Sequence, residues 1–581
     1  MADRRVRIQA LDAQHITTGN IRLLLGIAAA AIAWQAFSAH RISPWWLAAP
    51  VVGFAVLMIR HERILRKRTL AQRAAQFYER GIARLEHRWA GTGECGLRFA
   101  SAAHPYSGDL DLFGKGSLFE LLNQARTSGG EDWLAGCLLA PSSSDQIMAR
   151  QRAVEELRPA IDLREEIFVL GEDVREAVDS KRLVEWGESP ALLDTAKLQW
   201  MAGALSLLVA VSFFVMLKTG LVSVFALMLV AVAGFGYWLR PRVLAVITRV
   251  DEAVHDLELL SELLVRIESR EFESPRLSAL KQALSSNGVP PSRHIRRLHR
   301  LAELLDSRDN IVMRVLGPPL LYATHLAFAV ERWRAANGSD IRRWLDTLSE
   351  FEAISSFAGY TYEHPGDPFP VFDHQTVIDG EDLGHPLLPE GRCVRNSVKL
   401  DAERRMLVVS GSNMSGKSTY LRTIGVNVVL AMAGLPVRAK SLRLCPLAVG
   451  AAIRVTDSLQ EGASRFYAEI VRLRKILDLT GGGTRVLFLL DELLAGTNSH
   501  DRRIGAEGIL KELLAREAVG LITTHDLALT AIAETLGSSA VNVHFEDHLE
   551  NGQLRFDYTL RPGVVRKSNA LELMRSIGLD V

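Results

Sequence analysis

The sequence predicts two helical membrane hairpins, an all-α region around them, and a C-terminal α/β domain built on a mostly parallel sheet. Three observations lead to this fold class. Four uncharged apolar runs lie before residue 240. Between and after them, apolar residues recur at helical spacing. From about residue 370, short apolar runs alternate with helix-like segments, which is typical of a parallel sheet.

Length and composition limit the class of protein. A chain of 581 residues is too long for one hydrophobic core, so we expect two to four structural units. A net charge of +1 argues against a generally basic protein that wraps nucleic acid, but leaves room for a local basic surface. The cysteines have no metal-binding spacing and indicate reduced thiols in the cytosol. They are Cys95, Cys137, Cys393 and Cys445.

The apolar runs have nearly the length needed to cross a bilayer, about 17–25 residues. They are Leu23–Phe37, Pro44–Ile59, Trp200–Leu217 and Leu221–Leu239. The second pair is the stronger prediction, because Trp200, Tyr237 and Trp238 are placed as interfacial anchors. We therefore predict an N-terminal transmembrane hairpin over 1–60 and a second one over 199–240. A cleaved signal peptide and buried soluble helix pairs are the alternatives.

The basic residues around these runs predict the topology. Arginine and lysine precede the first run and follow the second and fourth runs, whereas the connecting turns hold only Arg41 and Lys218. The flanking residues are Arg4, Arg5, Arg7, Arg22, Arg60, Arg63, Arg66, Lys67, Arg68, Arg240, Arg242 and Arg249. The positive-inside rule then places both termini and all large loops in the cytoplasm. A multi-pass protein of the inner (cytoplasmic) membrane is expected.

Two helical regions, 61–198 and 241–370, are predicted outside the membrane. In the second region, apolar residues at three- and four-residue spacing mark one helix face. They are Val250, Val254, Leu257, Leu260, Leu264 and Ile267. The stretch Arg293–Arg300 is a basic helix face, which is either solvated or in contact with phosphates. Its arginines are Arg293, Arg296, Arg297 and Arg300.

The α/β domain, predicted over 371–581, contains a phosphate-binding loop. The segment "GSNMSGKST" follows the apolar run "MLVVS" and precedes a helix-like segment, and it has the spacing of a Walker A motif. Glycines allow the backbone to wind around phosphate. The predicted ATP-binding residues are Gly411, Ser412, Asn413, Met414, Ser415, Gly416, Lys417, Ser418 and Thr419. Lys417 would neutralise the β- and γ-phosphates, and Ser418 would ligate Mg²⁺.

Acidic residues follow at the end of a second predicted strand. Asp491 and Glu492 end the run "RVLFLLDE". Asp491 would hold the Mg²⁺ shell, and Glu492 would act as general base on the attacking water. The alternative is a pair of carboxylates that cap a helix. His525 ends the next predicted strand, "VGLITTH", where it can sense the γ-phosphate by a hydrogen bond.

At these motifs the chain resembles the MutS mismatch-repair ATPases. "GSNMSGKST" is similar to their "GPNMGGKST", "DELLAGTNS" to their "DEIGRGTST", and "TTHD" to their "ATH". "DSLQEGASRF" resembles the signature segment, and "GHPLL" with the later Asn396 resembles the approach to the loop. Gly116–Pro141 and Arg150–Pro159 are similar to the family's helical core. The resemblance covers roughly 105–195 and 245–581.

The resemblance implies a homodimer through ABC-type ATPase domains. Each ATP, with its Mg²⁺, would lie between the loop of one subunit and the signature of the other. Lys417 and Ser418 would grip phosphate and metal, with Asn413 beside them. His525 would be the switch, and Ser464 would reach the partner's γ-phosphate in trans. Double-stranded DNA would be the ligand.

The chain also departs from the family pattern. A membrane hairpin stands where the family has an N-terminal α/β domain that reads mismatches. The family's mismatch wedge is Phe-x-Glu, which "FYE" at Phe77–Glu79 matches only as a tripeptide on a predicted helix. We therefore expect any DNA binding to be independent of sequence and of mismatches.

Three functions stay open on the sequence. The first is a membrane-tethered MutS-like ATPase that closes as a dimer around DNA or another long partner. The second is ABC-type transport, although the apolar runs hold no charged residue to mark a substrate path. The third is a membrane-associated scaffold without DNA binding, against which Glu492 argues.

Overall fold

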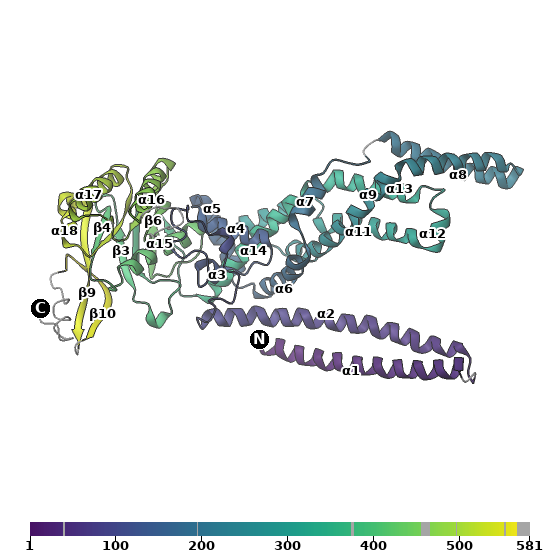
Figure 1. Cartoon of the computed structure of the whole chain (residues 1–581), viewed down its shortest axis with the longest axis horizontal. Coiled ribbons are helices and arrows are strands. Elements are labelled where there is room, and N and C mark those ends of the chain that lie inside the picture. The colour runs from purple at the N-terminus through teal and green to yellow at the C-terminus, as the bar shows by residue number, and fades with distance from the viewer. Residues whose placement is uncertain are drawn as a thin grey trace. The chain divides into compact units, whose positions relative to one another are not determined.

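A computed structural model describes residues 1–38, 41–193, 196–286, 288–373, 377–454, 465–495, 497–550 and 553–565. The chain divides into two compact units. The first unit consists of Met1–Ala83, Ile161–Glu271 and Ala279–Leu348. The second consists of Arg84–Ala160, Phe272–Ser278 and Ser349–Val581. Figure 1 labels their helices and strands.

The first unit is helical throughout its described residues (Figure 1). Its helices are α1 (Ala2–Ala33), all but the end of α2 (Ala48–Leu85), α6 (Ile161–Ala177), α7 (Ser180–Glu188), α8 (Ala196–Thr219), α9 (Val222–Glu268), the last part of α10 (Pro275–Leu284), α11 (Pro291–Asp306), α12 (Ile311–Leu316), α13 (Tyr322–Asn337) and the first part of α14 (Asp340–Glu363). Short turns of π- and 3₁₀-helix, Trp34–Ser38 and Pro44–Leu47, lie between α1 and α2.

Four helical segments of the described chain are long and apolar enough to cross a membrane. They are Ala2–Ser38, Pro44–Leu85, Ala196–Thr219 and Val222–Glu268, and each contains one of the predicted apolar runs. The helices are longer than the runs, so the predicted boundaries at residues 60 and 240 fall inside α2 and α9. Even Pro241 does not end α9, although proline removes one backbone hydrogen bond.

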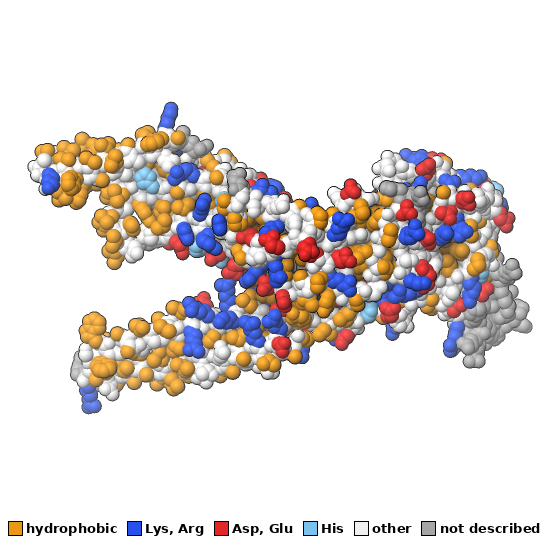
Figure 2. Space-filling model, turned by 180° about the vertical axis from the view of Figure 1, so that it is seen from behind, with side chains coloured by type: hydrophobic (Ala, Val, Ile, Leu, Met, Phe, Trp, Pro, Cys, Tyr) orange, Lys and Arg blue, Asp and Glu red, His pale blue; other side chains and the backbone are white. Residues whose placement is uncertain are grey.

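The apolar side chains of these four segments lie mostly on the surface of the chain. Only 6% to 17% of the residues in their most apolar windows are buried. Trp45, Trp200 and Tyr237 are 83%, 80% and 77% exposed. Figure 2 shows apolar side chains gathered on the long helices of the first unit. Monomeric soluble proteins rarely expose such extended apolar patches, so burial as soluble helix pairs is not supported by this structure.

Beyond its apolar part, α9 forms the core of the first unit. The predicted face from Val250 to Ile267 is confirmed, because all six of its apolar residues are buried. On α11, Ile295 and Leu298 are buried, whereas the four predicted arginines are exposed. Phe77 of the "FYE" tripeptide is buried against Phe168 of α6, with ring centroids 5.3 Å apart. A side chain packed in this way is not available as a wedge.

Helices at the start of the second unit pack beside the last part of α14. They are α3 (Leu118–Leu122), α4 (Ser128–Leu139) and α5 (Ser144–Leu157). Each begins with a serine or threonine whose side chain accepts a backbone N–H, which stabilises a helix start. The carboxylate of Glu352 in α14 is buried and accepts the backbone N–H groups of Arg126 and Thr127 at 3.2 and 3.3 Å. This interaction fixes the start of α4 on α14.

The second unit contains the predicted parallel sheet. Its order is β10 (Gln553–Pro562), β9 (Ala540–Glu550), β4 (Met406–Ser410), β8 (Val519–Thr524), β7 (Arg485–Leu490) and β6 (Leu447–Ala452). All pairings are parallel except that of β9 with β10. The helices that follow its strands are α15 (Lys417–Ala433), α16 (Arg465–Leu479), α17 (Ser499–Ala515), α18 (Leu527–Thr530) and α19 (Ile532–Thr535).

A second, four-stranded sheet was not predicted from the sequence. Its order is β1 (Val371–Phe372), β5 (Ser441–Leu444), β2 (Ile378–Leu383) and β3 (Asn396–Leu400). These strands are short, and β2 and β3 alternate buried with exposed residues, so they lack the continuous apolar runs of β4, β7 and β8. The small sheet carries the residues 383–396 to the edge of the candidate site.

A buried ion pair allows a direct test of the second unit. Arg84 donates to Glu363 through Nε (2.7 Å) and Nη2 (2.6 Å), and both side chains are less than 10% exposed. Arg84→Ala leaves a buried carboxylate unpaired, so we expect a loss of about 3–5 kcal/mol in the free energy of unfolding. Thermal unfolding in detergent measures it. Arg84→Ala combined with Glu363→Leu should recover part of the loss, and equal losses in the two variants would contradict this account.

Candidate nucleotide site

The loop from Gly411 to Gly416 joins β4 to the start of α15. Met414 at φ 70° and Gly416 at φ 101° turn the backbone through the left-handed region. At Gly416 a side chain would also meet the ring of Tyr558, because an added Cβ would lie 3.1 Å from its Cδ1. Glycine is therefore required there, both for the turn and for the close contact.

Lys417 begins α15 with its side chain folded back over this loop. Its Nζ donates to the carbonyl oxygens of Gly411 and Ser412 at 2.8 and 2.9 Å. Burial lowers the pKa of Lys417, and the nearby carboxylates of Glu492 and Asp491 oppose that shift. Among the described residues, the hydroxyls of Ser412 and Ser415 are buried without a hydrogen-bond partner. Unpaired buried donors beside a cation suit an oxyanion, because leaving them unpaired costs free energy.

The predicted carboxylates directly follow β7, beside the end of the neighbouring strand β8. Thr523 of β8 donates its hydroxyl to Asp491 Oδ1, and the same hydroxyl accepts the backbone N–H of Glu492 at 3.1 Å. Glu492 itself is at φ 50°, an uncommon conformation for a residue with a side chain. His525 Nδ1 lies 3.1 Å from Glu492 Oε1. Parallel pairing of β7 with β8 thus brings Asp491, Glu492 and His525 together.

One cleft of about 990 Å³ joins the loop to the carboxylates. Of the predicted site residues, Asn413, Met414, Gly416, Lys417, Ser418, Thr419, Asp491 and Glu492 line it. Gly411, Ser412 and Ser415 lie within the same loop, and His525 reaches the site through Glu492. Ser464 lies outside the described residues, so the structure does not place its side chain.

Sequence reasoning missed another part of the wall of this cleft. Val394 and Tyr558 line it, from the segment before β3 and from β10. Asn396 joins these two segments, because its side chain donates to Tyr558 O at 2.9 Å and accepts from Leu560 N at 2.8 Å. In the sequence, Asn396 was the one residue that could have indicated this part of the cleft. Tyr558, at φ 55° beside an irregularity in β10, gave no such indication.

His385 also lines the cleft and is kept neutral by its surroundings. It is buried, which lowers the pKa of its imidazole to about 4, and the positive charges of Arg422 and Arg438 add to the effect. Its Nδ1 accepts the backbone N–H of Leu387 at 3.3 Å. A neutral ring suits this structural role near two arginines.

A segment far away in the sequence holds the elements around the site in place. The buried carboxylate of Asp109 accepts the backbone N–H groups of Ile453 and Arg454, at 2.7 and 2.8 Å, directly after β6. Arg422 of α15 donates to the carbonyl oxygen of Asp109 at 3.1 Å, and Arg472 of α16 lies 3.7 Å from its carboxylate. Asp109 therefore joins the helix after the phosphate loop to both ends of the segment that carries Ser464.

The side chains at the site suit Mg²⁺ only if a bound nucleotide supplies further ligands. Within the described ranges no group of three or more His, Cys, Asp or Glu side chains could hold a metal by itself. Ser418 and Asp491 nevertheless line the same cleft. Mg²⁺ is commonly held by one or two carboxylates together with substrate phosphates and water, so one hydroxyl and one carboxylate are a suitable protein contribution.

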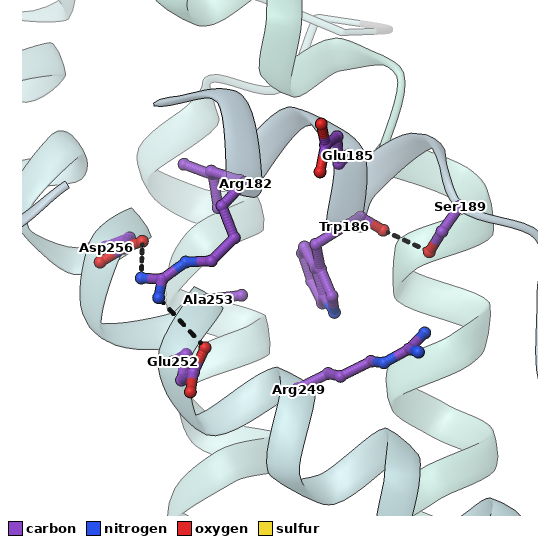
Figure 3. Close-up of a pocket in the computed structure, with 9 residues that line it drawn as sticks. Arg182, Glu185, Trp186, Ser189, Arg249, Glu252, Ala253 and Asp256 are labelled. Atoms are coloured by element: carbon purple, nitrogen blue, oxygen red, sulfur yellow. Dashed lines mark hydrogen bonds and ion pairs between the residues drawn. The ribbon is translucent and has the colours of Figure 1, made fainter. Parts of the chain in front are cut away.

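A second cavity, of about 350 Å³, lies in the first unit between α7 and α9 (Figure 3). Arg182 points into it and pairs with Asp256 and Glu252 at 3.2 and 3.3 Å. Burial raises the pKa of Asp256, and the guanidinium of Arg182 opposes that shift. Because these charges are paired with one another and none belongs to a predicted motif, we assign this cavity to helix packing.

Comparisons with known proteins agree with the geometry of the site. Residues 407–580 match the family model described as MutS domain V. The chain is 37% identical to Endonuclease MutS2 of Thermus thermophilus over 203 residues, which are 34% of this chain and 25% of that protein. It is 33% identical to DNA mismatch repair protein MutS 2 of Halobacterium salinarum over 243 residues, 40% of this chain and 26% of that protein.

A third relative is the DNA mismatch repair protein MutS of Streptococcus sanguinis. It is 31% identical over 240 residues, 40% of this chain and 28% of that protein. The chain thus spans about a quarter of the length of these curated relatives. The domain match and the relatives thus show that the matched part of the chain is similar to MutS proteins.

The close approach of Tyr558 to Gly416 gives a test of the loop. Gly416→Ala forces a side chain into the left-handed region and against Tyr558, so we expect a loss of about 1–3 kcal/mol in the free energy of unfolding. Gly508→Ala is the matched control, because Gly508 lies in α17 with open space around it. There we expect a gain of about 0.5–1 kcal/mol. Thermal unfolding measures both, and equal effects would contradict the assignment.

Proposed function

We propose that the chain is a membrane-anchored MutS-like ATPase that couples ATP binding and hydrolysis to closure of a homodimer, with DNA as its ligand. The observation that carries the proposal is the single cleft that gathers Lys417 and Ser418 with Asp491 and Glu492. All four of these residues lie in the segment matched to MutS domain V. The relatives' names, which refer to an endonuclease and to mismatch repair of DNA, favour DNA as the ligand.

In this proposal the loop and the strand ends divide the work. The loop backbone and Lys417 bind the phosphates, and the buried hydroxyls of Ser412 and Ser415 gain acceptors that they lack among the described residues. Mg²⁺, held by Ser418 and Asp491, would neutralise phosphate charge. Glu492 takes the proton of the attacking water. His525 orients Glu492 through the contact at 3.1 Å, and it would act as the switch by sensing the γ-phosphate of a bound nucleotide.

Dimer closure would complete each site in trans. Ser464 of one subunit reaches the γ-phosphate bound by the other, as the resemblance of "DSLQEGASRF" to the family signature implies. The hydrogen bonds and ion pair of Asp109 support this coupling, because they connect α15, which begins at Lys417, with both flanks of the segment that carries Ser464. The dimer contact itself is through the ATPase domains.

The membrane is the second part of the proposal. The two hairpins span the inner membrane, and the ATPase domain lies in the cytoplasm with both termini. Support comes from the four long apolar helical segments with exposed side chains and from the basic residues at their flanks.

Catalysis by Glu492 is tested by replacing its carboxylate with an amide. Glu492→Gln keeps the size of the side chain but cannot accept the proton of water, so we expect ATP hydrolysis to fall about 10²–10⁴-fold while ATP still binds. Release of phosphate by the purified full chain in detergent measures it. The matched control is Glu507→Gln, which removes a surface carboxylate paired with Lys511 in α17. Turnover near wild type in Glu492→Gln would assign the base elsewhere.

DNA binding should be independent of sequence and blind to mismatches. Within the described part of the chain the first strand is β1 at Val371, so no α/β domain for reading mismatches precedes it, and Phe77 is buried. The exposed arginines of α11 would bind phosphates, with a steep dependence on salt. We expect duplex DNA to stimulate ATP hydrolysis equally with and without a mismatch.

The salt dependence of DNA binding tests whether the arginines of α11 bind the phosphates or whether the loss of any positive charge has the same effect. Replacing Arg293, Arg296, Arg297 and Arg300 by alanine should lower the slope of log affinity against log salt by about 0.9 for each phosphate that is no longer neutralised. Arg474→Ala, which removes an exposed arginine of α16, should leave the slope unchanged. A clear preference for mismatched duplex at fixed salt would overturn the proposal of mismatch-independent binding.

A further inference from the structure

The segment from Ile311 to Leu321 exposes an unusual amount of apolar surface for its length. It comprises the short helix α12 and a turn that leads into α13. Ile311, Val312 and Val315 are 82%, 62% and 70% exposed, and Leu316 and Leu320 are 53% and 43% exposed. With six residues, α12 is far too short to cross a bilayer. The positive-inside rule placed this stretch in the cytoplasm with the rest of its region.

Two contacts place this segment beside the apolar parts of α8 and α9. The hydroxyl of Ser206 in α8 donates to the carbonyl oxygen of Leu320 at 3.0 Å. On α9, a Cβ added to Gly236 would lie 3.2 Å from the side chain of Leu321. Ser206 is six residues inside Trp200 and Gly236 is three residues inside Leu239. At 1.5 Å per residue, the contacts lie about 5–9 Å inside the ends of the predicted spans.

The backbone N–H groups of the turn are satisfied without water. The N–H groups of Gly317, Leu320, Leu321 and Tyr322 donate to the carbonyl oxygens of Met313, Gly317, Pro318 and Gly317, respectively. The remaining residues, Pro318 and Pro319, have no backbone N–H. Every residue from 317 to 322 therefore has its N–H bonded or lacks one. Paired N–H groups favour placing this non-helical backbone at membrane depth, because hydrocarbon offers no replacement partners.

We propose that residues 311–321 form a third membrane-contacting element, which inserts into the cytoplasmic leaflet beside the second hairpin. The acyl-chain region of the bilayer covers the apolar surface of this element. The turn after α12 contacts α8 next to Leu207, which is 65% exposed, and the depth of the contacts of the turn matches the 5–10 Å typical of interfacial elements. The exposed Arg314 reaches the headgroups by extending its side chain. This inference rests on the proposed membrane anchoring of α8 and α9.

The test uses polarity-sensitive fluorophores on single cysteines in the full chain, after Cys95→Ser and Cys393→Ser remove the half-exposed thiols. Val315→Cys reports on α12. Leu227→Cys, 63% exposed in the apolar part of α9, reports on the hairpin, and Arg297→Cys on the exposed face of α11 is the aqueous control. Each variant is reconstituted into phosphatidylcholine–phosphatidylglycerol vesicles at low protein-to-lipid ratio, with nitroxide lipids as quenchers.

For the Val315 label we expect a blue-shifted emission and loss of most of its fluorescence to nitroxides placed near the headgroups, with less loss to nitroxides near the chain ends. The Leu227 label should be quenched most by the deeper nitroxides, and the Arg297 label by neither. Quenching at Leu227 but not at Val315 would overturn the inference and leave the anchoring intact. A blue shift at Val315 without quenching would show a second copy or another protein as the occupant, which also overturns it. No quenching at Leu227 would contradict the anchoring itself, and the inference with it.

Discussion

Strand β4 pairs in parallel with β8, and β8 pairs in parallel with β7. The three strands therefore end at one edge of the sheet, at Ser410, Thr524 and Leu490. The phosphate loop, the carboxylates and His525 follow these three strand ends directly. Thr523 of β8 then links its strand to the end of β7 through a single hydroxyl, which donates to Asp491 and accepts the backbone N–H of Glu492. The chemistry of the site depends on this register, because a slip by one residue would turn Thr523 to the other face of the sheet.

Buried polar groups then connect the site to its surroundings at specific points. Asp109 and Asn396 each join two segments that are far apart in the sequence, and each does so by hydrogen bonds to backbone atoms. Backbone hydrogen bonds of this kind fix the position of a segment whatever its side chains are. Residues that take no part in phosphate binding therefore hold the wall of the cleft that contains Tyr558. They also hold the flanks of the segment that carries Ser464.

The loop, the strand-end carboxylates and the three central strands could be predicted because local sequence is sufficient for them. Glycine spacing and continuous apolar runs have a direct physical meaning. Tyr558 and Asp109 could not be predicted, since their roles arise from contacts over more than 100 residues of sequence. The small sheet was missed because its strands are short and half exposed. α12 was missed because six apolar-rich residues carry no periodic signal. The lengths of α2 and α9 were missed because the end of an apolar run does not end a helix, not even at Pro241.

The continuity of α9 has a mechanical consequence. Its 47 residues extend for about 70 Å, so a tilt of one degree at one end displaces the other by about 1 Å if the helix is straight. Pro241, two residues after the apolar part ends, lacks the hydrogen bond that would stiffen the helix there. Bending is therefore least costly at this point, between the largely exposed apolar half and the more densely buried residues from Val243 onward. Tilting of the apolar half can be absorbed there before it strains the packed half.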